Sequence, residues 1–363
     1  MSRQCRQDRR RNFTVYDQAV DIVSCWEAFA EFSYDEILSD FYFDRFPTIP
    51  RSGEDDLTPD FTIYFDDNYG IIGEIKRTFP EDDRAFNSTV DQLSKYDDSH
   101  SLKTSSGSRV EPDVCDVVTL ISGSDAPQIG TRISDLREQG EFNFENNLVV
   151  LRYQYNTTAD LSRYEFQRVT QVDDEFQDSV LPLPSDKLLS SELGEQGSYG
   201  TMKVYPTHFT SIKVKTPVCN DDPPTSYLAT ILWHKIFPEY LTRDDFHEWR
   251  QGNAQKTIPL KITLDEIQQR VNEDYLQNGH IRKTWIRDAL DFLATANLAR
   301  STNDGYEIQF RGLVRNVGEE NHQKGTQELD QMKELATRFI NRYCEYSDEG
   351  NRVTENQKSI NEF

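Results

Sequence analysis

"TPDFTIYFDDNYGIIGEIKRTF", residues 58–79, places a proline–aspartate pair ahead of one apolar run and a Glu-Ile-Lys triplet inside the next. The two runs, 61–65 and 71–76, are short and rich in β-branched and aromatic residues, which favours strands. The letters between them, "DDNYG", are typical of a turn. This stretch therefore predicts a β-hairpin.

The hairpin brings three charged side chains together. Because side chains alternate along a strand, Glu74 and Lys76 share one face while Ile75 points into a core on the other. The length of the connection places Asp60 opposite them, and directly opposed Cβ atoms lie roughly 4.5–5.5 Å apart. Two carboxylates that close repel each other unless they share a cation or a proton. An ordinary solvated hairpin is the alternative to a site for Mg²⁺ or Mn²⁺, hard cations that prefer oxygen ligands.

A second pattern follows the hairpin. Residues 86–97, "FNSTVDQLSKYD", predict a helix capped by Asn87 or Ser88. Gln92 and Tyr96 are four residues apart, so this helix would carry both on one face.

These residues resemble a known family. Pro59-Asp60, a spacer and then Glu74-Ile75-Lys76 look like the PD-(D/E)xK motif of the restriction-endonuclease-like nucleases, and "QLSKY" is similar to the Q-x-x-x-Y motif of their RecB-like branch. The family core runs helix, three strands, helix, strand. The order predicted here is similar, with a helix at 14–32 and a buried strand at 116–122. The resemblance covers about residues 13–155 and implies an α/β fold with a mixed sheet flanked by helices.

The resemblance also implies roles for individual residues, in a nuclease that uses Mg²⁺ or Mn²⁺ to hydrolyse phosphodiester bonds, most readily in DNA, with RNA not excluded. Metal ligands would be Asp60, Glu74 and the carbonyl of Ile75; Lys76 would serve the nucleophilic water; Gln92 and Tyr96 would orient the substrate or the site. Family members often add an acid from the first helix, for which Glu27 is favoured over Glu31 and Glu36. The chain departs from the cluster-bearing nucleases of that branch, because the required cysteine group is absent, and it carries no helicase motifs.

The C-terminal third has a different character. "PVCNDDPPTS" (217–226) predicts a linker between the nuclease-like domain, 13–216, and a second domain, 227–317. Three amphipathic helices and a hairpin with an Asp-Gly turn resemble a winged helix-turn-helix domain; their ranges are 227–237, 263–275, 281–299 and 300–310. Arg282, Lys283 and Arg287 give its third helix a cationic face suited to DNA, with protein docking as the alternative.

The two ends of the chain carry further patterns. Residues 1–12 form an arginine-rich tail that either holds a phosphate backbone or keeps the terminus soluble. Residues 318–363 contain an amphipathic helix at 326–346 and a polar tail. That helix is expected to dimerise, dock a partner, or pack on its own chain.

Composition limits the function classes. The net charge of −23 argues against an unspecific polyanion binder, although the excess of Asp over Glu and of Arg over Lys suits a salt-rich cytoplasm where charge is screened. Five cysteines without a C-x-x-C pair predict neither a disulfide framework nor a zinc ribbon, and six histidines show no metal spacing. With no apolar span and no secretory signal, we expect a cytoplasmic protein without a membrane.

Two functions follow from these patterns. The first is a metal-dependent nuclease, which by family analogy would be the effector of an anti-phage defence or restriction system, or a DNA-repair enzyme, working with a protein partner or as a homo-oligomer. The second is a catalytically silent DNA-binding or assembly protein that uses the winged helix. Intact Asp60, Glu74 and Lys76 favour the first.

Overall fold

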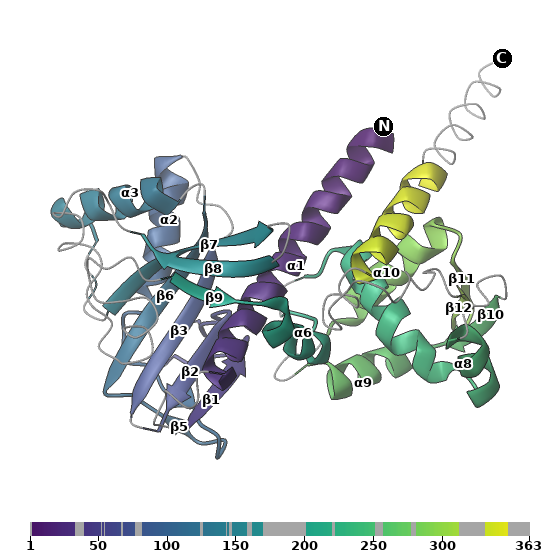
Figure 1. Ribbon diagram of the computed structural model, residues 1–363, viewed down its shortest axis with the longest axis horizontal. Helices are drawn as coiled ribbons and strands as arrows, with labels where there is room; N and C mark the ends of the chain where they lie inside the picture. The colour runs from purple at the N-terminus through teal and green to yellow at the C-terminus, as the bar shows by residue number, and fades with distance from the viewer. Residues whose placement is uncertain are drawn as a thin grey trace. The chain divides into compact units, whose positions relative to one another are not determined.

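The structure is a computed structural model (Figure 1). It describes residues 2–32, 40–51, 53, 55–66, 68–76, 82–123, 126–142, 144, 147–157, 162–169, 201–219, 222–250, 257–276, 281–311 and 331–347. The chain divides into two compact units, Ile22–Ile212 and Met1–Asp21 with Lys213–Phe363. The predicted tail over 1–12 is the first part of a long helix, α1 (Ser2–Phe32), which contributes to both units.

The unit Ile22–Ile212 is an α/β domain with a mixed sheet flanked by helices, as the sequence predicted, and the sheet has seven strands. The strand order is β1-β2-β3-β6-β7-β8-β9. β3, β6 and β7 are parallel, and the other neighbours are antiparallel. The strands are β1 (Phe41–Arg45), β2 (Phe61–Phe65), β3 (Tyr69–Lys76), β6 (Val114–Ser122), β7 (Asn147–Thr157), β8 (Ser162–Arg168) and β9 (Thr201–Val204), and a separate pair is formed by β4 (Leu102–Lys103) and β5 (Arg109–Val110).

The predicted hairpin is formed by β2 and β3. Phe61 pairs with Gly73, and Phe65 pairs with Tyr69, so the turn falls at the predicted "DDNYG". Asn68 in this turn has a φ of 67°, which asparagine tolerates better than most residues. Gly73 is required for close packing, because a Cβ there would lie 2.1 Å from the Phe61 ring.

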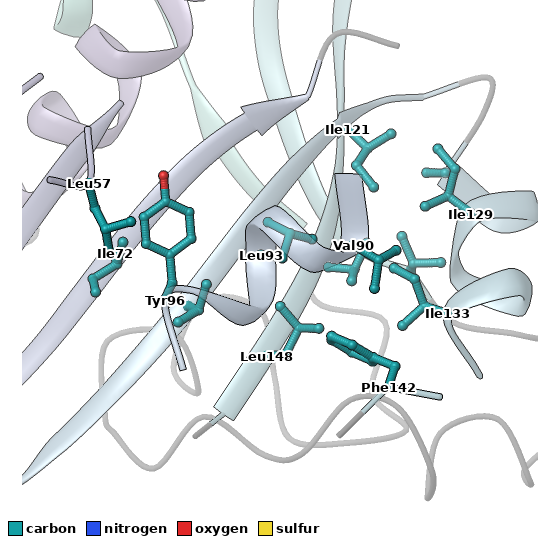
Figure 2. Close-up of a cluster of buried hydrophobic side chains, with 14 of the residues drawn as sticks. Leu57, Ile72, Val90, Leu93, Tyr96, Ile121, Ile129, Ile133, Phe142 and Leu148 are labelled. Atoms are coloured by element: carbon teal, nitrogen blue, oxygen red, sulfur yellow. The ribbon is translucent and has the colours of Figure 1, made fainter. Parts of the chain in front are cut away.

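Two helices cover one face of the sheet, α2 (Asp83–Ser94) and α3 (Ala126–Glu138). Their apolar side chains meet those of β3, β6 and β7 in one buried cluster. Figure 2 shows Val90 and Leu93 of α2 beside Ile133 of α3, facing Ile121 and Leu148 from the strands. This cluster fixes α2 over the end of β3.

The opposite face of the sheet packs on α1. The Trp26 ring lies 5.4 Å from the Phe61 ring and 6.0 Å from the Phe166 ring. All three side chains are buried. Phe61 and Gly73 therefore belong to the α1 face, and their strand neighbours Thr62, Ile72 and Glu74 belong to the α2 face.

The second unit contains the helices and the hairpin that the sequence predicted for its C-terminal part. The predicted helices are α7 (Thr225–Ile231), which continues as η1 (Leu232–Ile236) and η2 (Phe237–Tyr240), α9 (Leu264–Asp274) and α10 (Lys283–Thr295). Two further helices were not predicted: α8 (Arg243–Arg250), and α6 (Pro206–Lys215), which begins in the unit Ile22–Ile212 and ends in this one. β11 (Ala299–Thr302) and β12 (Gly305–Phe310) form the hairpin, and β10 (Ile258–Ile262), which was not predicted, completes a sheet of order β10-β12-β11. Within the predicted linker, residues 220–221 lie outside the described residues.

The arginine-rich start of α1 packs against a helix at residues 331–347, which overlaps the predicted 326–346. The Arg9 guanidinium lies 3.9 Å from the centre of the Tyr343 ring, and Arg6 forms an ion pair with Glu345 at 3.1 Å. The helix at 331–347 therefore packs back on its own chain, one of its three expected roles. These arginines have intramolecular partners, which neither reading of the tail anticipated.

A disulfide joins Cys5 to Cys344. The prediction of no disulfide framework rested on short spacings, and these two cysteines are 339 residues apart in the sequence. Cys25, Cys115 and Cys219 form no disulfide. None of the described helices has both the length and the apolar composition of a membrane span.

We expect Cys5→Ser to lower the free energy of unfolding by about 2–4 kcal/mol, because the disulfide restricts the unfolded chain. Urea unfolding without reductant measures the difference. Dithiothreitol should bring the wild type down to the variant and leave the variant unchanged. A wild type insensitive to dithiothreitol would contradict the expectation.

Candidate active site

β3 carries the centre of the site. The Lys76 ammonium lies 2.7 Å from Glu74 Oε1, so both side chains occupy the α2 face of the sheet. Glu74 is buried, with 7% of its surface exposed. A carboxylate this deep needs polar partners to compensate for its lost hydration.

Asp60 lies next to Glu74 across the hairpin. Its backbone N–H donates to the Gly73 carbonyl at 3.0 Å, which extends the β2–β3 register by one residue. The Asp60 carboxylate in turn accepts a 2.7 Å hydrogen bond from the Ile75 N–H. The backbone of the Glu-Ile-Lys triplet thus holds the first acid beside the second.

α2 supplies the third side of the site. Lys76 Nζ donates to Gln92 Oε1 at 2.9 Å, and the Tyr96 hydroxyl donates to Glu74 Oε2 at 2.9 Å. Glu74 therefore accepts one hydrogen bond on each carboxylate oxygen. The structure brings Asp60, Glu74, Lys76, Gln92 and Tyr96 into one hydrogen-bonded group.

The helix that carries Gln92 begins and ends three residues earlier than the predicted 86–97. It ends at Ser94, and the N–H groups of Lys95, Tyr96 and Asp97 bond to carbonyls three residues back. This tighter winding is typical of a final helical turn. Tyr96 therefore reaches Glu74 from the turn after α2, and the prediction that both residues lie on one helix is wrong in that detail.

Burial and charge keep Tyr96 protonated. Burial is the largest cause that raises the pKa of its hydroxyl far above the ordinary value, followed by the charge of Glu74, their hydrogen bond and the charge of Asp60. A neutral hydroxyl can donate to Glu74 at every pH at which the protein would work. Tyr96 is thus a permanent donor that orients one carboxylate oxygen of Glu74.

The structure does not bring the predicted first-helix acid to this group. Glu27 accepts a 2.5 Å hydrogen bond from Arg45 Nε, and Arg45 also donates to Ser24 at 3.2 Å. Arg45 pairs with Phe61, so this ion pair lies on the α1 face. Glu31 is exposed, and Glu36 lies outside the described residues.

The donor set fits a small hard cation. Asp60 and Glu74 offer carboxylate oxygens, and the Ile75 carbonyl is the third oxygen that the family resemblance implies. Within the described ranges, no further Asp, Glu, His or Cys gathers with them as a larger cluster. Mg²⁺ typically uses one or two carboxylates and keeps several waters, so two acids are sufficient.

Sequence reasoning missed an arginine on the same face. Lys76 pairs with Ile121, Ile121 pairs with Arg152, and Arg152 pairs with Gln167, so the four residues form one row across the sheet. Arg152 Nε donates to Gln167 at 2.9 Å. The sequence does show that Arg152 interrupts the apolar run "NLVVLRYQY". Its distance from Lys76 could not be predicted, because that distance depends on the register of β3, β6 and β7.

The predicted cationic face on α10 is mixed in charge. Lys283 forms an ion pair with Asp265, and the Arg282 guanidinium lies 5.2 Å from the centre of the Trp285 ring. Arg287 is exposed, as is Asp288 beside it. The face therefore offers less positive potential than the sequence indicated.

Comparison with known proteins returned no matching family model, no matching curated protein and no matching solved structure. The case for a function rests on the geometry of Asp60, Glu74 and Lys76 and on the motifs that contain them.

Proposed function

We propose that this chain is a PD-(D/E)xK nuclease of restriction-endonuclease-like fold, which hydrolyses phosphodiester bonds with Mg²⁺ or Mn²⁺. The observation that carries the proposal is the position of Lys76, which donates to both Glu74 and Gln92, while Asp60 is held by the Ile75 N–H. The order α1, β1 to β3, α2, β6 also supports it, because the family core runs helix, three strands, helix, strand.

The residues have separable tasks in this chemistry. A bound Mg²⁺ would polarise the phosphate and favour ionisation of the attacking water. Asp60 and Glu74 hold the cation, and Tyr96 keeps the Glu74 carboxylate oriented. Lys76 has three N–H donors, of which two are used on Glu74 and Gln92, so one remains for a phosphate oxygen or the attacking water. Arg152, on the same face, is placed to bind a neighbouring phosphate.

The second unit is consistent with a separate binding module in addition to the catalytic domain. Its α7, α9 and α10 with the sheet β10-β12-β11 fit a winged helix-turn-helix arrangement. DNA contact through Arg282, Lys283 and Arg287 is one use of this module. The Lys283–Asp265 ion pair favours the other use, docking of a protein partner. A catalytically silent assembly protein would use this module for binding and would not hydrolyse phosphodiester bonds.

The test is cleavage of plasmid DNA, single-stranded DNA and RNA oligonucleotides by the full chain, with Mg²⁺ or Mn²⁺, at low and high salt. We expect cation-dependent cleavage that EDTA stops and Lys76→Met removes. Lys261→Met changes an exposed lysine of the other unit and should leave cleavage intact. Cleavage that survives both EDTA and Lys76→Met would overturn the proposal, and cation uptake without cleavage of any substrate would favour the assembly role.

A further inference from the structure

Thr119 is a buried threonine on β6 with an unusual hydroxyl. The side chain has no exposed surface, and its hydroxyl oxygen has no hydrogen-bond partner among the described residues. A buried hydroxyl left unpaired destabilises the folded state, because it has lost its hydrogen bonds to water. Such a group in a folded protein calls for an explanation, often a water or an ion that it binds in another state.

The register places Thr119 directly beside the candidate site. β3 and β6 are parallel and Glu74 pairs with Thr119, so the two side chains stand on the same face of adjacent strands. Adjacent strands are about 4.7–4.9 Å apart. The other sheet neighbours of Thr119 on this face are apolar: Val117 and Ile121 along β6, and Val150 across on β7. Among these neighbours of Thr119, Glu74 is therefore the polar one.

The partners of Glu74 suggest when a further donor is needed. Oε1 accepts from the Lys76 ammonium and Oε2 accepts from Tyr96. A divalent cation on Glu74 would repel the ammonium, so the bond to Lys76 would weaken as the cation binds. A neutral hydroxyl carries no such repulsion, and a threonine side chain can change the direction of its hydroxyl by adopting another rotamer.

We propose that Thr119 is a positioning residue, whose hydroxyl donates to the Glu74 carboxylate when a divalent cation displaces Lys76. This inference rests on the proposed function, because it assigns a role to Thr119 in the same cation site. This role explains why position 119 holds a threonine among apolar neighbours on β6 and β7. It also explains why the threonine hydroxyl has no hydrogen-bond partner when no cation is bound. Lys76 is then released toward Gln92 and the substrate.

A purely structural role of Thr119 predicts a different cation affinity for the valine variant. If Thr119 only fills space in the sheet, valine has nearly the same shape and removes the unpaired hydroxyl. Thr119→Val would then be as stable as the wild type or more so, and its cation affinity would be unchanged.

The experiment measures Mn²⁺ binding by calorimetry and urea unfolding without cation for the wild type, Thr119→Val and Thr119→Ser. We expect the valine variant to be at least as stable as the wild type without cation and to raise the Mn²⁺ Kd about tenfold, as loss of an outer-shell partner typically does. Serine keeps the hydroxyl and should restore most of the affinity. An unchanged Kd in the valine variant would overturn the role of Thr119 and leave the nuclease proposal standing. A wild type that binds no Mn²⁺ would overturn both.

Discussion

Glu74→Gln is expected to abolish uptake of divalent cations and to lower the cleavage rate by about 10²–10³-fold, the scale on which losing one preorganised electrostatic group acts. Glutamine keeps the size of the side chain and an oxygen that can accept from Tyr96. It loses the charge that attracts the cation and holds Lys76 at 2.7 Å. Calorimetry with Mn²⁺ and rates on the substrate that the wild type cuts best measure the two losses.

A matched change elsewhere on the sheet controls for this variant. Glu165 on β8 also accepts several hydrogen bonds, from Arg163, Gln154 and Asn156, but it lies in a different row of the sheet. Glu165→Gln should leave Mn²⁺ uptake unchanged. Urea unfolding without cation should be compared for both variants, because Glu74→Gln also removes the ion-pair partner of Lys76. Mn²⁺ uptake that survives Glu74→Gln would show that the cation binds elsewhere.

The local part of the site was open to prediction from sequence. The hairpin depends on alternation within short runs and on one turn, and β2 has the predicted limits, Phe61–Phe65. Once that register is known, Asp60 must lie beside Glu74. The helix with Gln92 follows within a few residues, so its position over β3 is restricted by a short connection.

The other features of the site and fold could not be predicted, because they depend on contacts between segments far apart in the sequence. Glu27 was assigned to the cation, but Arg45 of β1 binds it, and β1 was not predicted because its five residues lie in a stretch without a clear strand boundary. The position of Thr119 beside Glu74 follows from the parallel register of β3 and β6, which the sequence did not give. Cys5 and Cys344 are at opposite ends of the chain, where spacing carries no information on pairing.

Lys213→Met is expected to lower the free energy of unfolding by about 3–5 kcal/mol, the usual effect of removing one partner from a buried ion pair. Lys213 is 1% exposed, and its ammonium lies 2.6 Å from Asp17 and 2.5 Å from Asp21. Methionine fills a similar volume but leaves two buried carboxylates one helical turn apart on α1. Urea unfolding at pH 7.5 measures the loss.

The charges, rather than the lost volume, should account for this effect. Lys333→Met is the control, because Lys333 is half-exposed and 3.9 Å from Asp17, so its loss should cost about 0–1 kcal/mol. Adding Asp17→Asn and Asp21→Asn to Lys213→Met should recover much of the stability, since no unpaired charge then stays buried.

The pH dependence gives an independent check. Burial raises the pKa of Asp21 above its ordinary value, while Lys213 lowers it. Without Lys213 that pKa rises further. A carboxyl whose pKa is higher in the folded than in the unfolded state binds a proton on folding, so the deficit of Lys213→Met should shrink as the pH falls from 7.5 to 5. A deficit of equal size at both pH values would mean that Lys213 stabilises the fold through packing, because a packing loss does not titrate.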